Sequence, residues 1–231
     1  PYTSGVIRNK LNAGVTDPKA LILSPQEMLA KLEDEGYTEV EVVSTILFPG
    51  IEHEKLEKTV LEFSSANPGV KTGYTPPFLS RPENLQLAVN TLGKYMVHDA
   101  ANIVVAHGTH AGHPAERSYN DLAERIEKTY GNARLASVEG LPDLKQALGW
   151  AKNYPARNVN FIVFMFVAGD HAENDIASDE DDSMFSAVRK MGKEPTVPFV
   201  NTSAGKRIGS LGLDPDYRAL LLEYFEKNIN E

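Results

Sequence analysis

The sequence predicts an α/β protein of two similar halves, each a parallel sheet flanked by helices, with a cleft between the halves. Two short apolar runs, 102–106 and 160–168, have the composition of buried parallel strands, which are covered on both faces. Each run is followed within a few residues by a histidine, His107 in the first case and His171 in the second. Because ligands in open α/β sheets bind at the carboxyl ends of the strands, we expect both histidines at one working edge.

Length and composition limit the classes of protein that fit. A chain of 231 residues suits one large α/β domain or two small ones. The formal net charge of −9 and the lack of a basic stripe argue against a nucleic-acid partner. The chain has no cysteine, which excludes disulfides, thiolate metal sites and cysteine nucleophiles. A homo-oligomer is compatible with these features.

Targeting signals and membrane segments are also missing from the sequence. No apolar run is long enough to cross a bilayer, and no signal peptide opens the chain. We therefore expect no membrane partner and a cytoplasmic protein. The chain starts at Pro1 without a methionine, so we expect the natural N-terminus to be missing. A periplasmic location is the alternative, because a signal would lie in that missing part.

Capping and turn residues divide the first half, which we place at 1–97, into alternating helices and strands. Ser24, Pro25 and Glu27 form a capping box at the start of one helix, which Gly36 ends. Alternating and apolar runs indicate the strands. The expected helices are 6–11, 24–35, 53–65 and 83–96, and the expected strands are 39–48 and 70–73.

The second half, which we place at 98–231, continues the alternation, as expected for parallel sheets. An acidic loop at 175–183 precedes a helix, where its negative charge suits the helix dipole. The last helix is amphipathic. The expected strands are 102–106, 133–138, 158–167 and 197–200, and the expected helices are 118–130, 142–152, 184–191 and 214–229.

The two halves repeat one another. A helix and a strand followed by Gly50 match a later helix and strand followed by Gly169, which places Glu52 opposite His171. The second half carries one further strand and helix before this point, and the first half has no counterpart to them. We infer that a first strand and helix of the N-terminal half belong to this fold and are absent from the sequence. Generic βα alternation is the alternative explanation of the repeat.

A carboxylate expected near the two histidines makes them candidates for a metal site. Glu139 ends the strand expected beside the His107 strand, and two imidazoles with one carboxylate suit a first-row divalent metal. Glu52, expected across the cleft, is the next candidate ligand. Solvated loop residues are the alternative for all four. No zincin helix, phosphate-binding glycine loop or dinucleotide fingerprint occurs.

A long and specific motif at 167–179 contains Gly169-Asp170-His171, and shorter motifs occur at 2–5, 10–11, 36–37, 50–52, 106–108 and 138–140. In these motifs the chain resembles the anaerobic-type cobalt chelatases of cobalamin biosynthesis, small class II chelatases that act on sirohydrochlorin. The resemblance runs along essentially the whole chain, except for the family's opening strand and helix. It implies two α/β halves with a cleft between them, and a terminal helix that packs back on the first half.

The resemblance also implies an activity and a metal site. The protein would insert a divalent metal into sirohydrochlorin, with cobalt first and iron or nickel as alternatives. His107 and His171 would bind the metal with Glu139 as the third ligand, and His107 would also accept a proton from the macrocycle. A histidine has an ordinary pKa of roughly 6.5, so it can take a pyrrole proton near neutral pH. No resident cofactor is required, because the metal is a substrate.

The tetrapyrrole would meet residues from the first half of the chain. The resemblance implies that Glu52 lines the cleft, and that Thr3 and Ser4 belong to the substrate-binding residues. The main alternative function is a non-catalytic carrier of a metal, haem or another tetrapyrrole on the same fold, and a metal-assisted hydrolase is a third. His53, beside Glu52, is expected to be an exposed residue at a helix start, with a haem ligand as the other interpretation.

Overall fold

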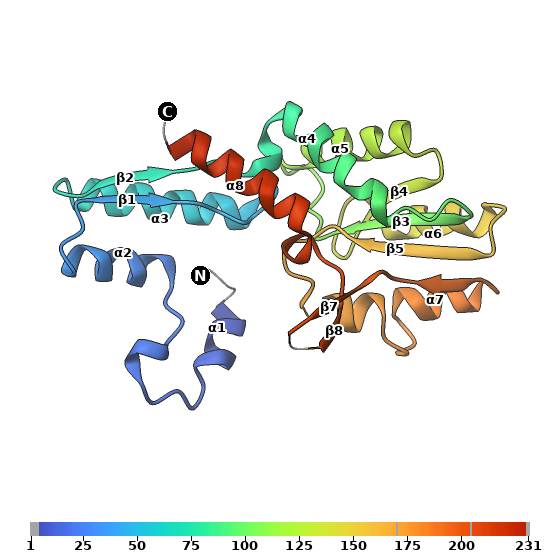
Figure 1. Cartoon of the computed structure of the whole chain (residues 1–231), viewed down its shortest axis with the longest axis horizontal. Coiled ribbons are helices and arrows are strands. Elements are labelled where there is room, and N and C mark those ends of the chain that lie inside the picture. The colour runs from blue at the N-terminus through green and yellow to red at the C-terminus, as the bar shows by residue number, and fades with distance from the viewer. Residues whose placement is uncertain (1–4, 170, 204, 230–231) are drawn as a thin grey trace. The chain divides into compact units, whose positions relative to one another are not determined.

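The computed structural model describes residues 5–169, 171–203 and 205–229, and these divide into two compact units (Figure 1). The first unit comprises the chain up to Ser44, Ile51–Pro76 and the end of the last helix from Lys227. The second unit comprises Thr45–Gly50 and Pro77–Glu226. The units thus join residues 77–97 to the second half, whereas the sequence placed them in the first. Domain boundaries at 1–97 and 98–231 stay a prediction.

Up to Pro76, the described residues of the first unit form three α-helices, one 3-10 helix and two parallel strands. Ser24 accepts a hydrogen bond from the backbone of Glu27 while the Glu27 side chain accepts one from the backbone of Ser24, which confirms the predicted capping box. The strands pair in register from Glu39 with Lys71 onward. The elements are α1 (Gly5–Asn12), a 3-10 helix (Pro18–Ala20), α2 (Pro25–Asp34), β1 (Glu39–Val42), α3 (Ile51–Ala66) and β2 (Lys71–Tyr74).

A four-stranded parallel sheet forms the centre of the second unit, in the order β4-β3-β5-β6. Its strands are β3 (Ala100–Ala106), β4 (Ala133–Ser137), β5 (Asn158–Val163) and β6 (Glu194–Thr196). Its helices are α4 (Pro82–Thr91), α5 (Glu116–Thr129), α6 (Leu144–Asn153), α7 (Met184–Lys190) and α8 (Pro215–Ile229, ending in the first unit), with 3-10 helices at Phe78–Ser80, Leu92–Tyr95 and Leu211–Leu213 and a π-helical turn at His171–Ile176. The predicted class, α/β with parallel sheets flanked by helices, is confirmed.

Alternate residues of β3 face two separate apolar cores. Val104 and Ala106 pack in one core with residues of α4, α5 and α8. Ile103 and Val105 pack in the other core with residues of α6 and α7. Every residue of β3 is buried, as a central parallel strand requires. Burial of each large apolar side chain contributes roughly 1.5–3 kcal/mol, so this strand is held firmly from both faces.

The last helix packs through Tyr217, Leu221 and Tyr224 on the same core as Phe78. Phe78 belongs to the segment that the sequence assigned to the first half, and to the second unit of the structure. None of the described helices is both long and apolar enough to cross a membrane.

Three predicted strands differ from the structure. β1 ends at Val42 and not at 48, although Leu47 and Phe48 are buried in the core of the second unit. β5 ends at Val163 and not at 167, although the Phe164 amide still bonds to the Val105 carbonyl of β3. The single strand expected at 197–200 is wrong. An antiparallel hairpin of β7 (Phe199–Thr202) and β8 (Gly205–Ile208) takes its place.

Asp214 holds the start of α8 to the 3-10 helix that follows α4. Its side chain is fully buried, and it accepts hydrogen bonds from Lys94 at 2.6 Å and from the Tyr95 hydroxyl at 2.7 Å. It also accepts bonds from the backbone amides of Asp216 and Tyr217, as a helix N-cap does. Burial by itself raises the pKa of Asp214, but these hydrogen bonds outweigh it, so the pKa lies below its ordinary value.

Replacing Asp214 by asparagine should lower the free energy of unfolding by about 2 kcal/mol at pH 7, because hydrogen bonds to charged groups are each worth roughly 1.5–3 kcal/mol. A carboxyl with a lowered native pKa stabilises the fold above its unfolded pKa and loses that contribution as the pH falls through its native pKa. The difference in free energy of unfolding between wild type and variant, measured by urea unfolding, should therefore become smaller below about pH 4.

Asp216→Asn is the matched control for this prediction. Asp216 also contacts Lys94 at 2.6 Å, but its side chain is 71% exposed. Exposed ion pairs contribute at most about 1 kcal/mol, so Asp216→Asn should lower the free energy of unfolding much less than Asp214→Asn does. Equal costs for the two variants, or a difference that does not change with pH, would contradict the role given to the buried carboxylate.

Candidate functional site

β3 delivers His107 to the carboxyl edge of the central sheet. The seven strand residues before it are buried, and His107 is the first exposed residue after them. Gly108 follows with a φ of +106°, a backbone conformation that side chains rarely adopt. The Tyr119 hydroxyl accepts a hydrogen bond from the Gly108 amide and donates one to the Gly108 carbonyl. The histidine therefore sits on a backbone that is fixed on both sides.

Glu139 lies beside His107 at the same edge. β4 pairs with β3 in parallel, which confirms the predicted neighbourhood of the two strands. The pairing extends beyond the strands, because the Glu139 amide donates to the His107 carbonyl at 2.9 Å. The chain then turns back, and Thr109 and Leu141 exchange two antiparallel hydrogen bonds. Glu139 itself is exposed, so its carboxylate has freedom to move.

His171 approaches His107 from the segment that follows β5. The two imidazole rings meet edge to face, with centroids 5.4 Å apart and planes at 84°. His171 opens the π-helical turn His171–Ile176, and its Nδ1 lies 2.6 Å from a carboxylate oxygen of Asp175. The sequence therefore placed the two histidines correctly at one edge of one sheet.

The predicted three-ligand site is not closed in this structure. Within 5–169, 171–203 and 205–229, no three histidine, aspartate or glutamate side chains are grouped closely enough to hold a metal ion. The two imidazole rings are adjacent and the Glu139 amide bonds to the His107 carbonyl, but the Glu139 carboxylate does not complete a three-ligand group with the rings. The assignment of His107, Glu139 and His171 as metal ligands stays a prediction.

The predicted substrate-binding residues belong to the first unit or lie outside the described residues. Glu52 is exposed in the first turn of α3, where a carboxylate interacts favourably with the helix dipole. The structure places it in a helix and not in the loop after a strand. Its role in lining the cleft stays a prediction. Thr3 and Ser4 lie outside the described residues.

His53 is buried, whereas the sequence led us to expect an exposed residue. Its ring stacks on Tyr74, and its Nδ1 is hydrogen-bonded to the Tyr74 hydroxyl. Burial lowers the pKa of His53, and the nearby carboxylates of Glu57 and Glu54 oppose this effect only in part. The side chain thus packs between α3 and β2 within the first unit.

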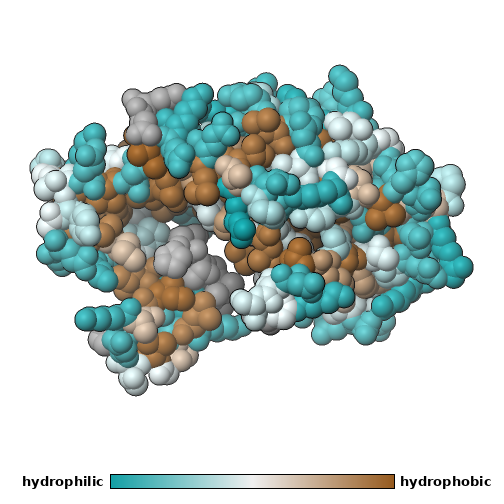
Figure 2. All heavy atoms as spheres, viewed as in Figure 1, coloured by the Kyte–Doolittle hydropathy of each residue, from teal (hydrophilic) through white to brown (hydrophobic). Residues whose placement is uncertain are grey.

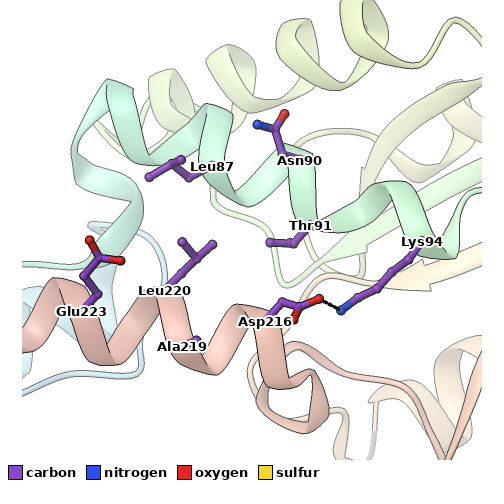
Figure 3. Close-up of a pocket in the computed structure, with 8 residues that line it drawn as sticks. All are labelled: Leu87, Asn90, Thr91, Lys94, Asp216, Ala219, Leu220 and Glu223. Atoms are coloured by element: carbon purple, nitrogen blue, oxygen red, sulfur yellow. Dashed lines mark hydrogen bonds and ion pairs between the residues drawn. The ribbon is translucent and has the colours of Figure 1, made fainter.

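One pocket of the second unit lies among residues other than the two histidines. A cavity of about 510 Å³ separates α4 from α8, and Figure 3 shows that side chains from both helices line it. Figure 2 shows a hydrophobic area over α4 beside α8. Lys94 closes one end through its ion pair with Asp216. The cavity contains no histidine and no predicted site residue, so we do not assign the chemistry to it.

Comparison with known families gives this geometry its context. The family model described as Cobalt chelatase (CbiK) matches residues 1–230. This chain belongs to the cobalt chelatase family. The family agrees with the resemblance found in the motifs, and the chain is accordingly an enzyme of the chelatase type.

Two relatives in this family have informative names. A sirohydrochlorin cobaltochelatase of Salmonella typhimurium strain LT2 is 28% identical over 234 residues, which cover 99% of this chain and 82% of the relative. The sirohydrochlorin cobaltochelatase CbiKC of Nitratidesulfovibrio vulgaris strain Hildenborough is 24% identical over 195 residues, covering 83% of this chain and 67% of the relative.

Solved structures show the same fold. SirB from Bacillus subtilis with Fe3+ has a TM-score of 0.61 and 11% identity, covering 96% of this chain and 87% of that chain. The sirohydrochlorin chelatase SirB from Bacillus subtilis subspecies spizizenii in complex with cobalt has a TM-score of 0.57 and 13% identity, covering 96% and 86%. At these identities the likeness establishes the fold alone.

Sequence reasoning missed two residues that support the site. Tyr119 fixes the Gly108 peptide and stacks on Phe48 with centroids 3.8 Å apart. Nothing in the sequence signals that contact, because Tyr119 looks like an ordinary helix residue. Asp175 could have been found, because it follows His171 by four residues and residues at that spacing share one face of a helical turn.

Proposed function

We propose that this protein is a sirohydrochlorin cobaltochelatase, which inserts divalent cobalt into sirohydrochlorin in cobalamin biosynthesis. The observation that carries the proposal is the meeting of His107 and His171, with ring centroids 5.4 Å apart, at the carboxyl edge of a parallel sheet. Glu139 follows the neighbouring strand β4, and its amide donates to the His107 carbonyl. The family and the names of the relatives support the same reaction.

The residue types suit the chemistry of metal insertion. Two pyrrole N–H protons must leave the macrocycle as the metal arrives, and a neutral imidazole accepts a proton near neutral pH. We assign this role to His107, which is exposed at the strand end and held on a fixed backbone. The metal must pass on to the four pyrrole nitrogens, so the protein must hold it with open coordination positions.

Two imidazoles and one carboxylate meet this requirement. His171 and His107 supply the borderline nitrogen ligands that cobalt, iron and nickel all accept. The Glu139 carboxylate is exposed, so in this proposal it would turn toward the two rings to bind the metal and would release it to the macrocycle. The same ligands bind several divalent metals, so the choice of cobalt rests on the family and not on the site.

The test is to incubate the protein with sirohydrochlorin and Co2+ and to follow the absorbance change of the macrocycle. We expect a rate well above the uncatalysed background, measured with Fe2+ and Ni2+ in parallel. A rate equal to background, with tight binding of the tetrapyrrole or metal, would overturn the proposed enzymatic function. It would favour the alternative function, a non-catalytic carrier. A preference for iron or nickel would overturn the assignment of cobalt alone.

Replacing Glu139 by glutamine should raise the Co2+ concentration needed for half-maximal rate by roughly 10- to 100-fold. Loss of a residue that only hydrogen-bonds to a metal ligand typically lowers metal affinity by this factor, and loss of a ligand should lower it at least as much. Glutamine keeps the size of the side chain and removes its charge. Steady-state rates at increasing Co2+ measure the effect. Glu127→Gln is the control, because Glu127 pairs with Arg134 at the opposite end of β4. An unchanged Co2+ dependence in Glu139→Gln would remove Glu139 from the ligand set.

The remaining expectations belong to the same proposal. The tetrapyrrole and the divalent metal are its substrates, and no resident cofactor is needed. We expect Glu52, Thr3 and Ser4 to contact the tetrapyrrole. We predict a cytoplasmic location and no nucleic-acid or membrane partner. A homo-oligomer is compatible with the proposed function.

A further inference from the structure

The π-helical turn His171–Ile176 presents an imidazole and a carboxylate on one side. His171 Nδ1 lies 2.6 Å from Asp175 Oδ2, the distance of a charge-assisted hydrogen bond. Both side chains are partly exposed, at 34% and 47%. The opposite side of the turn is anchored, because Ala172 and Ile176 are fully buried in the core behind β3 and β5.

The backbone of this turn brings the two side chains together. The amide of Ala177 bonds to the carbonyl of Ala172, five residues back, which is the π-helical pattern. With Ala172 and Ile176 fixed in the core, His171 and Asp175 have little freedom to separate. π-helical turns are frequently found at functional sites.

Three other acidic residues of the described segment 171–182 have basic side chains as partners. Glu173, in the same turn, has Arg207 at 3.8 Å. Asp179 pairs with Arg189 at 2.6 Å, and Asp181 pairs with Lys190 at 3.2 Å. Asp175 differs from these three in that its partner is an imidazole. The contact with His171 is therefore specific and not a general property of the acidic segment.

The hydrogen bond determines which nitrogen of His171 carries the proton. A carboxylate only accepts hydrogen bonds, so Nδ1 of a neutral His171 must be the donor. The proton then sits on Nδ1, and the lone pair of Nε2 is left available for a metal. Carboxylate partners of this kind fix the orientation of histidine ligands and raise their basicity.

We propose that Asp175 is a positioning residue, which holds His171 in the Nδ1–H tautomer with Nε2 directed to the incoming metal. The proposal rests on the proposed function for the identity of that metal, but the tautomer is a property of the metal-free protein. Asp175 does not touch the metal. It acts through His171, because the hydrogen bond disfavours the Nε2–H tautomer and limits rotation of the imidazole ring.

The first test is nitrogen NMR of metal-free protein labelled with 15N-histidine, at a pH where the imidazoles are neutral. His171→Gln identifies the resonances of His171 among the six histidines. In wild type we expect Nδ1 protonated and Nε2 unprotonated. In Asp175→Asn we expect a mixture of tautomers, because an amide both donates and accepts. Asp175→Glu should restore the wild-type tautomer in part, and Glu173→Gln should leave it unchanged.

The second test is titration of the same proteins with Co2+. We expect Asp175→Asn to weaken binding by about 10- to 100-fold, as loss of an outer-shell partner does. Glu173→Gln removes the same charge from the same turn and should bind Co2+ as wild type does. Thermal unfolding of each variant shows that the fold is kept.

The outcomes separate the two proposals. A wild-type His171 protonated on Nε2, or a tautomer unchanged in Asp175→Asn, overturns the positioning role. Equal weakening of Co2+ binding by Asp175→Asn and Glu173→Gln also overturns it, because the effect is then one of general charge. If wild type inserts no metal but shows the expected tautomers and the expected loss of Co2+ affinity, the proposed function fails and the role of Asp175 stands.

Discussion

Replacing His107 by alanine should reduce the rate of cobalt insertion by about 10²- to 10⁴-fold, the range that a positioned proton acceptor contributes. The proposed reaction uses His107 twice, as a metal ligand and as the acceptor of a pyrrole proton. Its ring also faces His171 with centroids 5.4 Å apart. Removal of the ring therefore leaves His171 without its neighbour at the sheet edge. The measurement is the absorbance change of sirohydrochlorin with Co2+.

The stability of this variant should stay within about 0.5 kcal/mol of wild type, because His107 is exposed and substitutions at such positions rarely cost more. His98→Ala is the matched control. His98 is almost fully exposed and precedes β3, so it lies at the opposite end of the same strand. Full activity of His107→Ala, or an equal loss in His98→Ala, would show that the proton acceptor lies elsewhere.

The elements that the sequence predicted well are those with strong local signals. The capping box at Ser24 and Glu27 forms as expected because its two hydrogen bonds join residues three apart. β3 was predicted because a strand buried on both faces is apolar along most of its length, as Ile103–Ala106 is here. The same argument predicted the edge of the sheet, and with it the approach of His107 to His171.

The elements that the sequence did not predict depend on distant partners. Residues 43–48 are apolar enough for a strand, but Leu47 and Phe48 are buried in the core of the second unit instead of extending β1. The hairpin of β7 and β8 pairs two short segments that have no strong alternation of their own. Local patterns carry no information on which partner a short apolar segment will find.

The site shows the same division. The positions of His107, His171 and Glu139 follow from strand order, because parallel neighbours end at one edge. The supports of the site do not follow from it. Tyr119 reaches the Gly108 peptide from the following helix. Asp175 reaches His171 because residues 171–176 form a helical turn that Ala172 and Ile176 anchor in the core, and strand order does not indicate this turn.

Replacing Gly108 by alanine should destabilise the fold by roughly 2–5 kcal/mol, the sum of backbone strain and local overpacking. Its φ is +106°, where a side chain is strained. An added Cβ would also lie 1.7 Å from the Glu139 carbonyl oxygen and 2.7 Å from Ser137 Cβ. Because the nearest obstacle is backbone, the His107 and Glu139 loops must move apart to admit the methyl group.

Gly112→Ala separates the two contributions. Gly112 also has a positive φ, +80°, but an added Cβ meets nothing within 4 Å. That variant should therefore lose only about 1–2 kcal/mol from strain. Urea unfolding of both variants gives the costs, and equal costs would show that the close approach to Glu139 is unimportant.

The same substitution should impair the reaction in protein that remains folded. The amide of Glu139 bonds to the His107 carbonyl, so parting the loops displaces the proposed proton acceptor from the proposed third ligand. A misplacement of about 1 Å at a reacting group can cost 10²-fold in rate. We therefore expect Gly108→Ala to lose at least about tenfold in insertion rate below its unfolding temperature, and Gly112→Ala to lose little. Wild-type rates in folded Gly108→Ala would mean that the site does not depend on the close packing of these two strand ends.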